Sequence, residues 1–134
     1  MTEINQPDKD GRTALLNAVL KGDKNTVLNL IEAGAHINYK DKQGCTALHF
    51  TSQNYLVEIA NLLIKNGANL EAKDNYGNTP LWRAVFANGE RDGEAIKLLL
   101  SNGANPNNKN NSGVSPLELA CKIANYDVKQ FFKN

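Results

Sequence analysis

Residues 76–85 read Tyr-Gly-Asn-Thr-Pro-Leu-Trp-Arg-Ala-Val, and similar stretches occur at three other places in the chain. They are DGRTALLNAV at 10–19, QGCTALHFTS at 43–52 and SGVSPLELAC at 112–121. The glycines of the first three stretches lie 33 residues apart, at Gly11, Gly44 and Gly77, and Gly113 follows after 36. Such a period is typical of stacked units that bury their apolar faces against each other.

Each of these stretches predicts a turn followed by a short helix. The glycine supplies the positive φ that a tight turn requires. A hydroxyl residue two places later is positioned as the helix N-cap, at Thr13, Thr46, Thr79 and Ser115. Two prolines then occupy the first helical position, Pro80 and Pro116.

A second helix with a broad apolar face is expected in each unit, ended in three units by a left-handed glycine at Gly34, Gly67 and Gly103. A second repeated stretch contains these glycines: AGAHINYK at 33–40, NGANLEAK at 66–73 and NGANPNNK at 102–109. Together the two stretches resemble the ankyrin repeat. The resemblance implies an all-α ankyrin-repeat solenoid of four helix-turn-helix units joined by β-hairpin-like turns, with eight helices in antiparallel pairs. We expect one domain, 1–134, with units at 8–40, 41–73, 74–109 and 110–134.

The units depart from the ankyrin pattern in three places. The histidine of the family's T-P-L-H motif is present only as His49, which we expect to orient its turn through hydrogen bonds. The third unit carries three extra residues within 88–93. The fourth ends without the closing loop, as a C-terminal cap would, and its expected outward positions are polar: Glu118, Lys122, Asn125, Lys129 and Lys133.

Charge and hydropathy exclude several classes of function. Lys and Arg number 15 and Asp and Glu 14, so the net charge of +1 favours neither nucleic acid nor an anionic membrane. No apolar run approaches the roughly 18 residues of a membrane helix, and the N-terminal residues lack the features of a secretory signal. We therefore expect a cytoplasmic protein with two reduced cysteines.

The sequence offers no pattern for catalysis, a cofactor or a metal. Cys45 and His49 are the only tight pair of soft ligands, whereas a structural zinc site needs four. No Gly-rich phosphate loop and no nucleophile–base signature is present, so the chain is expected not to be an enzyme. Lysines at the turn tips, beside Asp8, Asp10, Asp41 and Asp74, are interpreted as a solvated edge, and the alternative is contact with an acidic patch on a protein.

In ankyrin repeats, partners contact the turn tips and the inner face of the first helices. Transferred by position, the resemblance gives these candidate partner-binding residues: Arg12, Leu20, Lys42, Gln53, Asn54, Tyr76, Asn78, Trp82, Phe86, Val114 and Ile123. Tyr76, Trp82 and Phe86 would form an aromatic anchor, flanked by Arg12, Lys42, Asn78 and Val114. The alternative is that Trp82 and Phe86 pack beneath the lengthened loop.

The segments Trp-Arg-Ala-Val-Phe (82–86) and Ile-Ala-Asn-Tyr-Asp-Val (123–128) resemble small bacterial ankyrin proteins encoded beside polymorphic toxins. This resemblance implies an immunity protein that binds a cognate toxin and blocks it sterically. Because no further domain is attached, we expect the stack itself to be the functional product, a monomer when free. The alternatives are a stand-alone adaptor or scaffold, a host-directed effector, and an enzyme subunit or ligand sensor.

Overall fold

The computed structural model describes residues 4–123 and 127–132, which form seven α-helices and one 3-10 helix without any β-strand. The elements are α1 (Ala14–Lys21), α2 (Lys24–Glu32), α3 (Ala47–Gln53), α4 (Val57–Lys65), α5 (Pro80–Ala87), α6 (Glu94–Ser101), α7 (Pro116–Lys122) and η1 (Val128–Phe132). The all-α fold class expected from the repeats is therefore confirmed.

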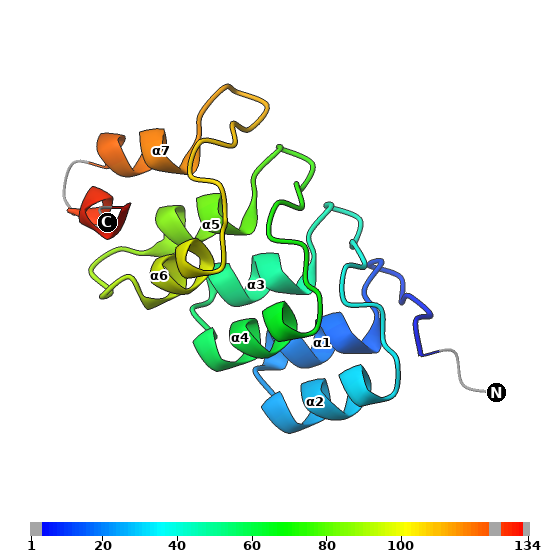
Figure 1. Ribbon diagram of the computed structural model, residues 1–134. Helices are drawn as coiled ribbons and strands as arrows, with labels where there is room; N and C mark the ends of the chain where they lie inside the picture. The colour runs from blue at the N-terminus through cyan, green and yellow to red at the C-terminus, as the bar shows by residue number, and fades with distance from the viewer. Residues whose placement is uncertain (1–3, 124–126, 133–134) are drawn as a thin grey trace.

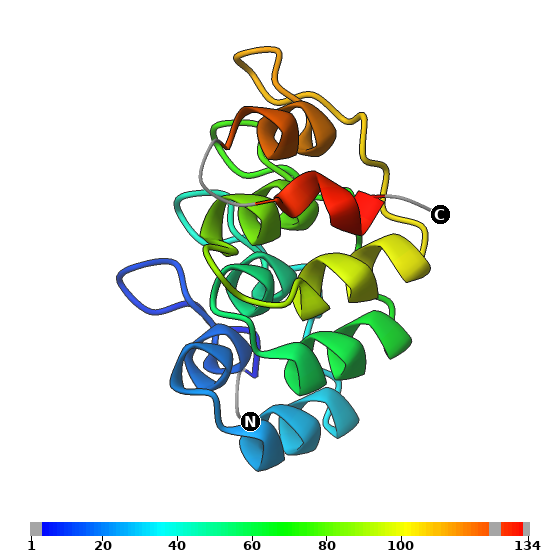
Figure 2. The same cartoon turned by 90° about the vertical axis from the view of Figure 1, so that its left-hand side faces the viewer.

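The helices stack in two columns (Figure 1). In one column α1, α3, α5 and α7 follow each other, and in the second α2, α4 and α6 do so. Figure 2 shows the columns side by side, with η1 continuing the second column above α6. The turns project beyond the first column, so they and the first helices form one continuous face.

The N-caps predicted from the repeats are confirmed at all four first helices. Each hydroxyl accepts a hydrogen bond from the backbone N–H three residues later, as between Thr79 Oγ1 and Trp82 N at 3.2 Å. Gly34, Gly67 and Gly103 have φ between 94° and 97°, as expected after the second helices. Local sequence thus sets where these helices begin and end.

The expectation of eight α-helices is wrong at the last element. Where the fourth unit was expected to have a second α-helix, the chain forms the five-residue 3-10 helix η1. Asn125 and Lys133, two of the outward positions, lie outside the described residues. Glu118, Lys122 and Lys129 are exposed, as expected.

The apolar residues form two clusters along the stack rather than one central core. Leu15, Val19 and Leu63 belong to the first, and Leu48, Leu81 and Leu99 to the second. Each of these side chains is almost completely buried. Neighbouring helix pairs therefore stabilise one another, since helices this short are unstable alone.

The turns are joined by side-chain bonds that the charge pattern did not predict. Lys40 Nζ donates to Lys73 O at 2.8 Å, and Lys73 Nζ donates to Lys109 O at 2.9 Å. Asp41 and Asp74 are buried, and each accepts two backbone N–H groups of its own turn. The lysines are exposed, as a solvated edge requires, but Asp41 and Asp74 do not belong to that edge.

The lengthened α5–α6 loop is anchored by side chains. Tyr55 Oη lies 2.9 Å from Ala84 O and 2.6 Å from Asn88 Oδ1, so these two oxygens share its one proton, while Asn88 Nδ2 donates to the carbonyls of Gly89 and Arg91. Burial raises the pKa of Tyr55, so it keeps its donating proton. The guanidinium of Arg91 lies 4.8 Å from the centre of the Tyr55 ring.

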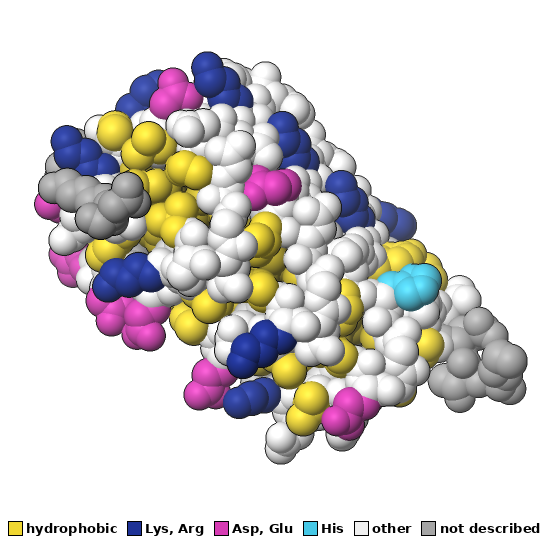
Figure 3. Space-filling view, in the orientation of Figure 1, with side chains coloured by type: hydrophobic (Ala, Val, Ile, Leu, Met, Phe, Trp, Pro, Cys, Tyr) yellow, Lys and Arg dark blue, Asp and Glu magenta, His cyan; other side chains and the backbone are white. Residues whose placement is uncertain are grey.

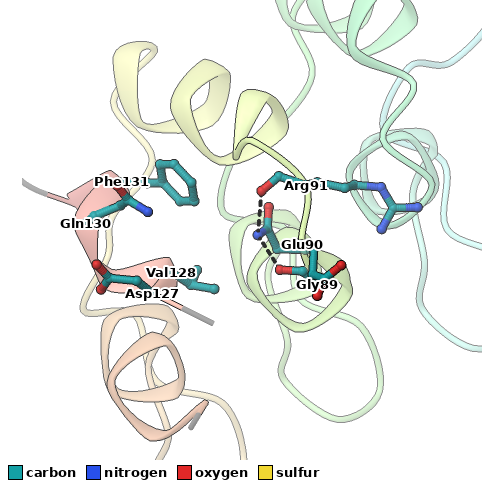
Figure 4. Close-up of a pocket in the computed structure, with 8 residues that line it drawn as sticks. Gly89, Glu90, Arg91, Asp127, Val128, Gln130 and Phe131 are labelled. Atoms are coloured by element: carbon teal, nitrogen blue, oxygen red, sulfur yellow. Dashed lines mark hydrogen bonds between the residues drawn. The ribbon is translucent and has the colours of Figure 1, made fainter. Parts of the chain in front are cut away.

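The same loop packs against η1. A Cβ added to Gly93 would lie 2.6 Å from the Phe131 ring, so the close approach requires glycine. Figure 4 shows the polar hollow between this loop and η1, with Asp127 and Gln130 on one side and Glu90 on the other. The extra residues of the third helix pair thus support the shortened last element.

Candidate protein-binding surface

The face formed by the first helices and turns carries an aromatic groove of about 430 Å³. We define the aromatic groove by its lining residues: Gln53, Tyr76, Asn78, Trp82, Arg83, Phe86 and Ala87. Trp82 and Phe86, one turn apart on α5, stack with ring centroids 5.5 Å apart and planes 16° apart. Phe86 is 67% exposed and Tyr76 is 70% exposed, whereas Trp82 is half-buried.

These exposures argue against the alternative in which Phe86 packs beneath the lengthened loop. Single exposed apolar residues are common, but a contiguous aromatic patch on a soluble protein is typical of an interaction surface. Trp82 contributes a ring to the groove while its Nε1 is buried without a partner among the described residues. The aromatic side of the groove therefore offers apolar contact.

A polar network underlies the other side of the groove. The Arg83 guanidinium donates to Asp74 Oδ2 from Nε at 2.9 Å and from Nη2 at 2.5 Å. It also donates from Nη1 to Gln53 Oε1, and from Nη2 to Cys45 Sγ at 3.2 Å. Four residues from two neighbouring helix pairs are thus fixed relative to one another.

Asp74 remains ionised within this network. Burial disfavours its charge, but hydrogen bonds from the Asn78 backbone and the Arg83 side chain outweigh burial and lower the pKa below 3.8. Burial raises the pKa of the Cys45 thiol, so this cysteine is neutral and structural rather than reactive. The network positions the groove and supplies no nucleophile.

His49 supports the turn that carries Tyr76. Its Nε2 lies 2.8 Å from the Asn78 carbonyl oxygen, and its Nδ1 lies 3.0 Å from the Thr46 backbone nitrogen. Since a backbone N–H only donates, Nδ1 is the acceptor and Nε2 carries the proton. Burial lowers the pKa of His49 from 6.5 to about 4, so the ring is neutral near pH 7. The expected role of His49 in orienting the turn is confirmed.

Asn78 has a different place from the one expected. Rather than projecting as a flank, it is 8% exposed and lines the groove itself. Its Oδ1 accepts from Asn110 Nδ2 at 2.9 Å. The turn geometry causes this burial, because Asp74 accepts the Asn78 backbone N–H and draws the residue inward.

The structure brings only part of the candidate set together. Gln53, Tyr76, Asn78, Trp82 and Phe86 line the groove, whereas the other six do not: Arg12, Leu20, Lys42, Asn54, Val114 and Ile123. Lys42 and Asn54 are exposed. Leu20 and Ile123 are half-buried against the first and second apolar clusters respectively.

Arg12 lies in a separate arrangement near the N-terminus. Its Nε is 3.9 Å from Asp41 Oδ2, and its guanidinium lies 5.9 Å from the centre of the Phe50 ring. Arg12 therefore packs within the first two turns instead of flanking the aromatic groove.

Arg83 lines the groove but was missed in the sequence analysis. The corresponding positions of Arg83 in the other units hold Asn17, Phe50 and Leu119, so the repeat gives no expectation for it. The available signal was Asp74, the aspartate of the preceding turn, with which a cation can form an ion pair.

A second hollow lies at the end of the stack, between α6 and η1. Hydrophobic side chains gather at this end in Figure 3, and the hollow of about 440 Å³ is lined by Lys97, Leu100, Ser101, Ala104, Pro106, Phe131 and Phe132. In the described part of the chain, no three His, Cys, Asp or Glu side chains converge as metal ligands would. Of the helices in the described ranges, none has the length and apolarity needed to cross a bilayer.

Comparison with known proteins identifies the family. The family model described as ankyrin repeats (3 copies) matches residues 15–110, most of the chain, so the protein belongs to the ankyrin repeat family. The ankyrin repeat is a non-catalytic fold that serves protein–protein interaction.

Curated relatives match 58–61% of this chain. The chain is 34% identical over 82 residues to protein fem-1 homolog A-like from Mus musculus, which covers 61% of this chain and 12% of that protein. It is 32% identical over 81 residues to SH3 and multiple ankyrin repeat domains protein 2 from Homo sapiens. That match covers 60% of this chain and 4% of the human protein. Serine/threonine-protein kinase 12 from Arabidopsis thaliana is 34% identical to this chain over 77 residues. That match covers 58% of this chain and 17% of the kinase. The chain thus spans less than a fifth of these relatives, and the similarity is that of shared repeats.

Proposed function

We propose that this chain binds a partner protein through the aromatic groove, with no catalysis of its own, and that it is an immunity-type inhibitor of a cognate toxin. The observation that carries the proposal is the cluster of Tyr76, Trp82 and Phe86, two of whose rings are largely exposed. Aromatic residues grouped in this way are typical of interaction hot spots.

The rigidity of the groove also supports binding. Its turn is held by His49 and Asp74, and its helix by the cap at Thr79. A surface that is already ordered loses little conformational entropy when a partner docks. A preformed surface is well suited to block a toxin's active cleft sterically.

The immunity role rests on the resemblance carried by residues 82–86 and 123–128, of which 124–126 lie outside the described residues. Residues 82–86 form the aromatic part of the groove, so the segment that carries the resemblance coincides with the candidate binding surface. The near-neutral charge favours a steric mechanism over electrostatic steering.

The test has two steps. Wild-type protein and the Phe86→Ala variant are used as baits in lysate from the source organism, and proteins retained by wild type alone are identified by mass spectrometry. The retained protein is then expressed in bacterial cells with and without this chain. We expect growth arrest that wild type and Glu58→Ala relieve and that Phe86→Ala relieves poorly.

Other outcomes separate the alternatives. A Phe86-dependent partner that does not impair growth would overturn the immunity role and favour an adaptor or scaffold. Retention of the same proteins by both baits would contradict the placement of the binding surface.

A further inference from the structure

We propose that the aromatic groove recognises an acidic side chain, Asp or Glu, placed beside an aromatic or aliphatic side chain in the partner protein. This inference rests on the proposed function, because it takes the groove as the docking surface. It adds the chemistry of the partner residue that occupies the polar side of the groove.

The first observation is that one N–H group of the Arg83 guanidinium makes no hydrogen bond to the described residues. A guanidinium has five N–H groups. In Arg83, Nε donates to Asp74, Nη2 to Asp74 and Cys45, and Nη1 to Gln53. One N–H of Nη1 has no acceptor among the described residues, and Arg83 lines the groove.

The second observation concerns the orientation of the Gln53 amide. Because arginine only donates, the Gln53 atom that faces it must be the oxygen, and the NH2 group points away from Arg83. This NH2 has no acceptor in the described part of the chain, nor is it among the buried atoms without a partner. It is therefore accessible to a ligand.

The amide of Asn78 adds a third donor. Its Oδ1 is occupied by Asn110, and its backbone oxygen by His49. Its Nδ2 has no acceptor among the described residues and is not among the buried atoms without a partner. Donors from α3, from α5 and from the turn between them thus line one groove, while the acceptors of Asn78 are already used.

The charge distribution favours an anion. The Asp74 side chain is 0% exposed, whereas the Arg83 side chain is 18% exposed. The cation of this ion pair therefore lies between Asp74 and the groove, so a ligand meets the positive end. A carboxylate can accept from several donors at once, and the neighbouring rings of Trp82 and Phe86 offer contact to an apolar side chain.

The test uses a phage library of randomised 12-residue peptides, selected on immobilised full-length protein. We expect wild type to enrich peptides in which Asp or Glu lies within three positions of an aromatic or aliphatic residue. In fluorescence-polarisation titrations, replacement of that acidic residue by its amide should weaken binding by about tenfold. Raising the salt concentration should weaken it as well.

The matched variant is Gln53→Glu. Its carboxylate can still accept from Arg83, so the fold is retained, which circular dichroism and thermal melting verify. It replaces the outward NH2 with negative charge, and binding of the acidic peptides should fall by about tenfold or more. Glu58→Gln on α4, remote from the groove, should change affinity less than twofold.

The outcomes distinguish this inference from the proposed function. Enriched peptides that lack acidic residues, but bind Phe86→Ala more weakly than wild type, would overturn the inference that the groove recognises a carboxylate. The groove would still be supported as the docking surface. Peptides that bind Phe86→Ala and Gln53→Glu as well as wild type would overturn both. A selection that enriches no peptide on wild type would also overturn the inference.

Discussion

His49 Nε2 donates a 2.8 Å hydrogen bond to the backbone carbonyl of Asn78, so one imidazole joins α3 to the turn that precedes α5. The opposite nitrogen accepts from the Thr46 backbone N–H at 3.0 Å. Protonation of the ring would place a hydrogen on Nδ1 facing that N–H, in a buried site. The geometry and the lowered pKa of His49 therefore agree.

The first prediction is a loss of stability in mild acid. In the unfolded chain His49 takes up a proton near pH 6.5, whereas in the folded chain it does so only at about pH 4. Between these values the unfolded state binds more protons, so the free energy of unfolding should fall by about 1.4 kcal/mol per pH unit. Urea titrations at pH 7, 6, 5 and 4.5 measure this slope.

The control for that slope is His49→Leu. It lacks both ring hydrogen bonds and should be less stable than wild type at pH 7, but flatter between pH 6.5 and 4.5. The carboxylates with lowered pKa contribute mainly below about pH 5, since their ordinary values are 3.8 to 4.5, and they contribute equally to both proteins. Equal slopes for wild type and His49→Leu would contradict the account of the histidine.

The second prediction concerns Tyr55, a non-glycine residue with a φ of 56°. Its left-handed backbone is strained, and the hydroxyl bonds to Ala84 and Asn88 offset that strain. Tyr55→Phe should lower the free energy of unfolding by about 1–3 kcal/mol, because it leaves the Asn88 side-chain oxygen without a donor. Tyr76→Phe, at an exposed ring, should change it by less than about 0.5 kcal/mol. Equal effects in urea unfolding would refute this role of Tyr55.

The third prediction tests burial in the stack. Leu48→Ala and Leu81→Ala each remove a side chain that is 1% exposed and should cost about 2–5 kcal/mol. Lys129→Ala, at an exposed position of η1, should cost less than about 0.5 kcal/mol. Chemical denaturation compares the three variants, and a mild effect at both leucines would mean that the helix pairs do not depend on this packing.

The fourth prediction concerns the contact between Gly93 and Phe131. Gly93→Ala adds a Cβ 2.6 Å from the ring and should displace η1, which hydrogen exchange at the amides of 128–132 detects. Gly89→Ala is the matched control, because Gly89 also has positive φ but nothing lies within 4 Å of its added Cβ. Faster exchange in both variants alike would attribute the effect to backbone strain rather than to the Phe131 contact.

Sequence reasoning succeeded where structure is local and repeated. The N-caps at Thr13, Thr46, Thr79 and Ser115, and the left-handed glycines after the second helices, depend on residues a few positions apart. Trp82 and Phe86 are four residues apart on α5, and helix geometry predicts that such residues contact each other. These features follow from helix chemistry, so one repeat predicts the next.

The remainder depended on contacts between units. Tyr55 lies 33 residues after Gly22, whose φ is 70°, so the two residues hold equivalent left-handed positions of the repeat. The sequence did not predict this conformation at position 55, because tyrosine rarely adopts positive φ. The ion pair of Arg83 with Asp74 joins a turn to a helix in one unit only. In the sequence Asp41 and Asp74 are indistinguishable from surface charges. In the structure each is buried and accepts two backbone N–H groups of its own turn.

The most direct test of the central claim is calorimetric titration of the captured partner into single variants. Tyr76→Ala or Phe86→Ala should weaken binding by about 2 kcal/mol or more with the fold nearly unchanged, because both rings face solvent in this structure. Glu58→Ala and Lys65→Ala, exposed on α4, should change the binding free energy by less than about 0.5 kcal/mol. Loss of binding in the α4 variants, with full affinity in both aromatic variants, would contradict the account and place the partner on the opposite face.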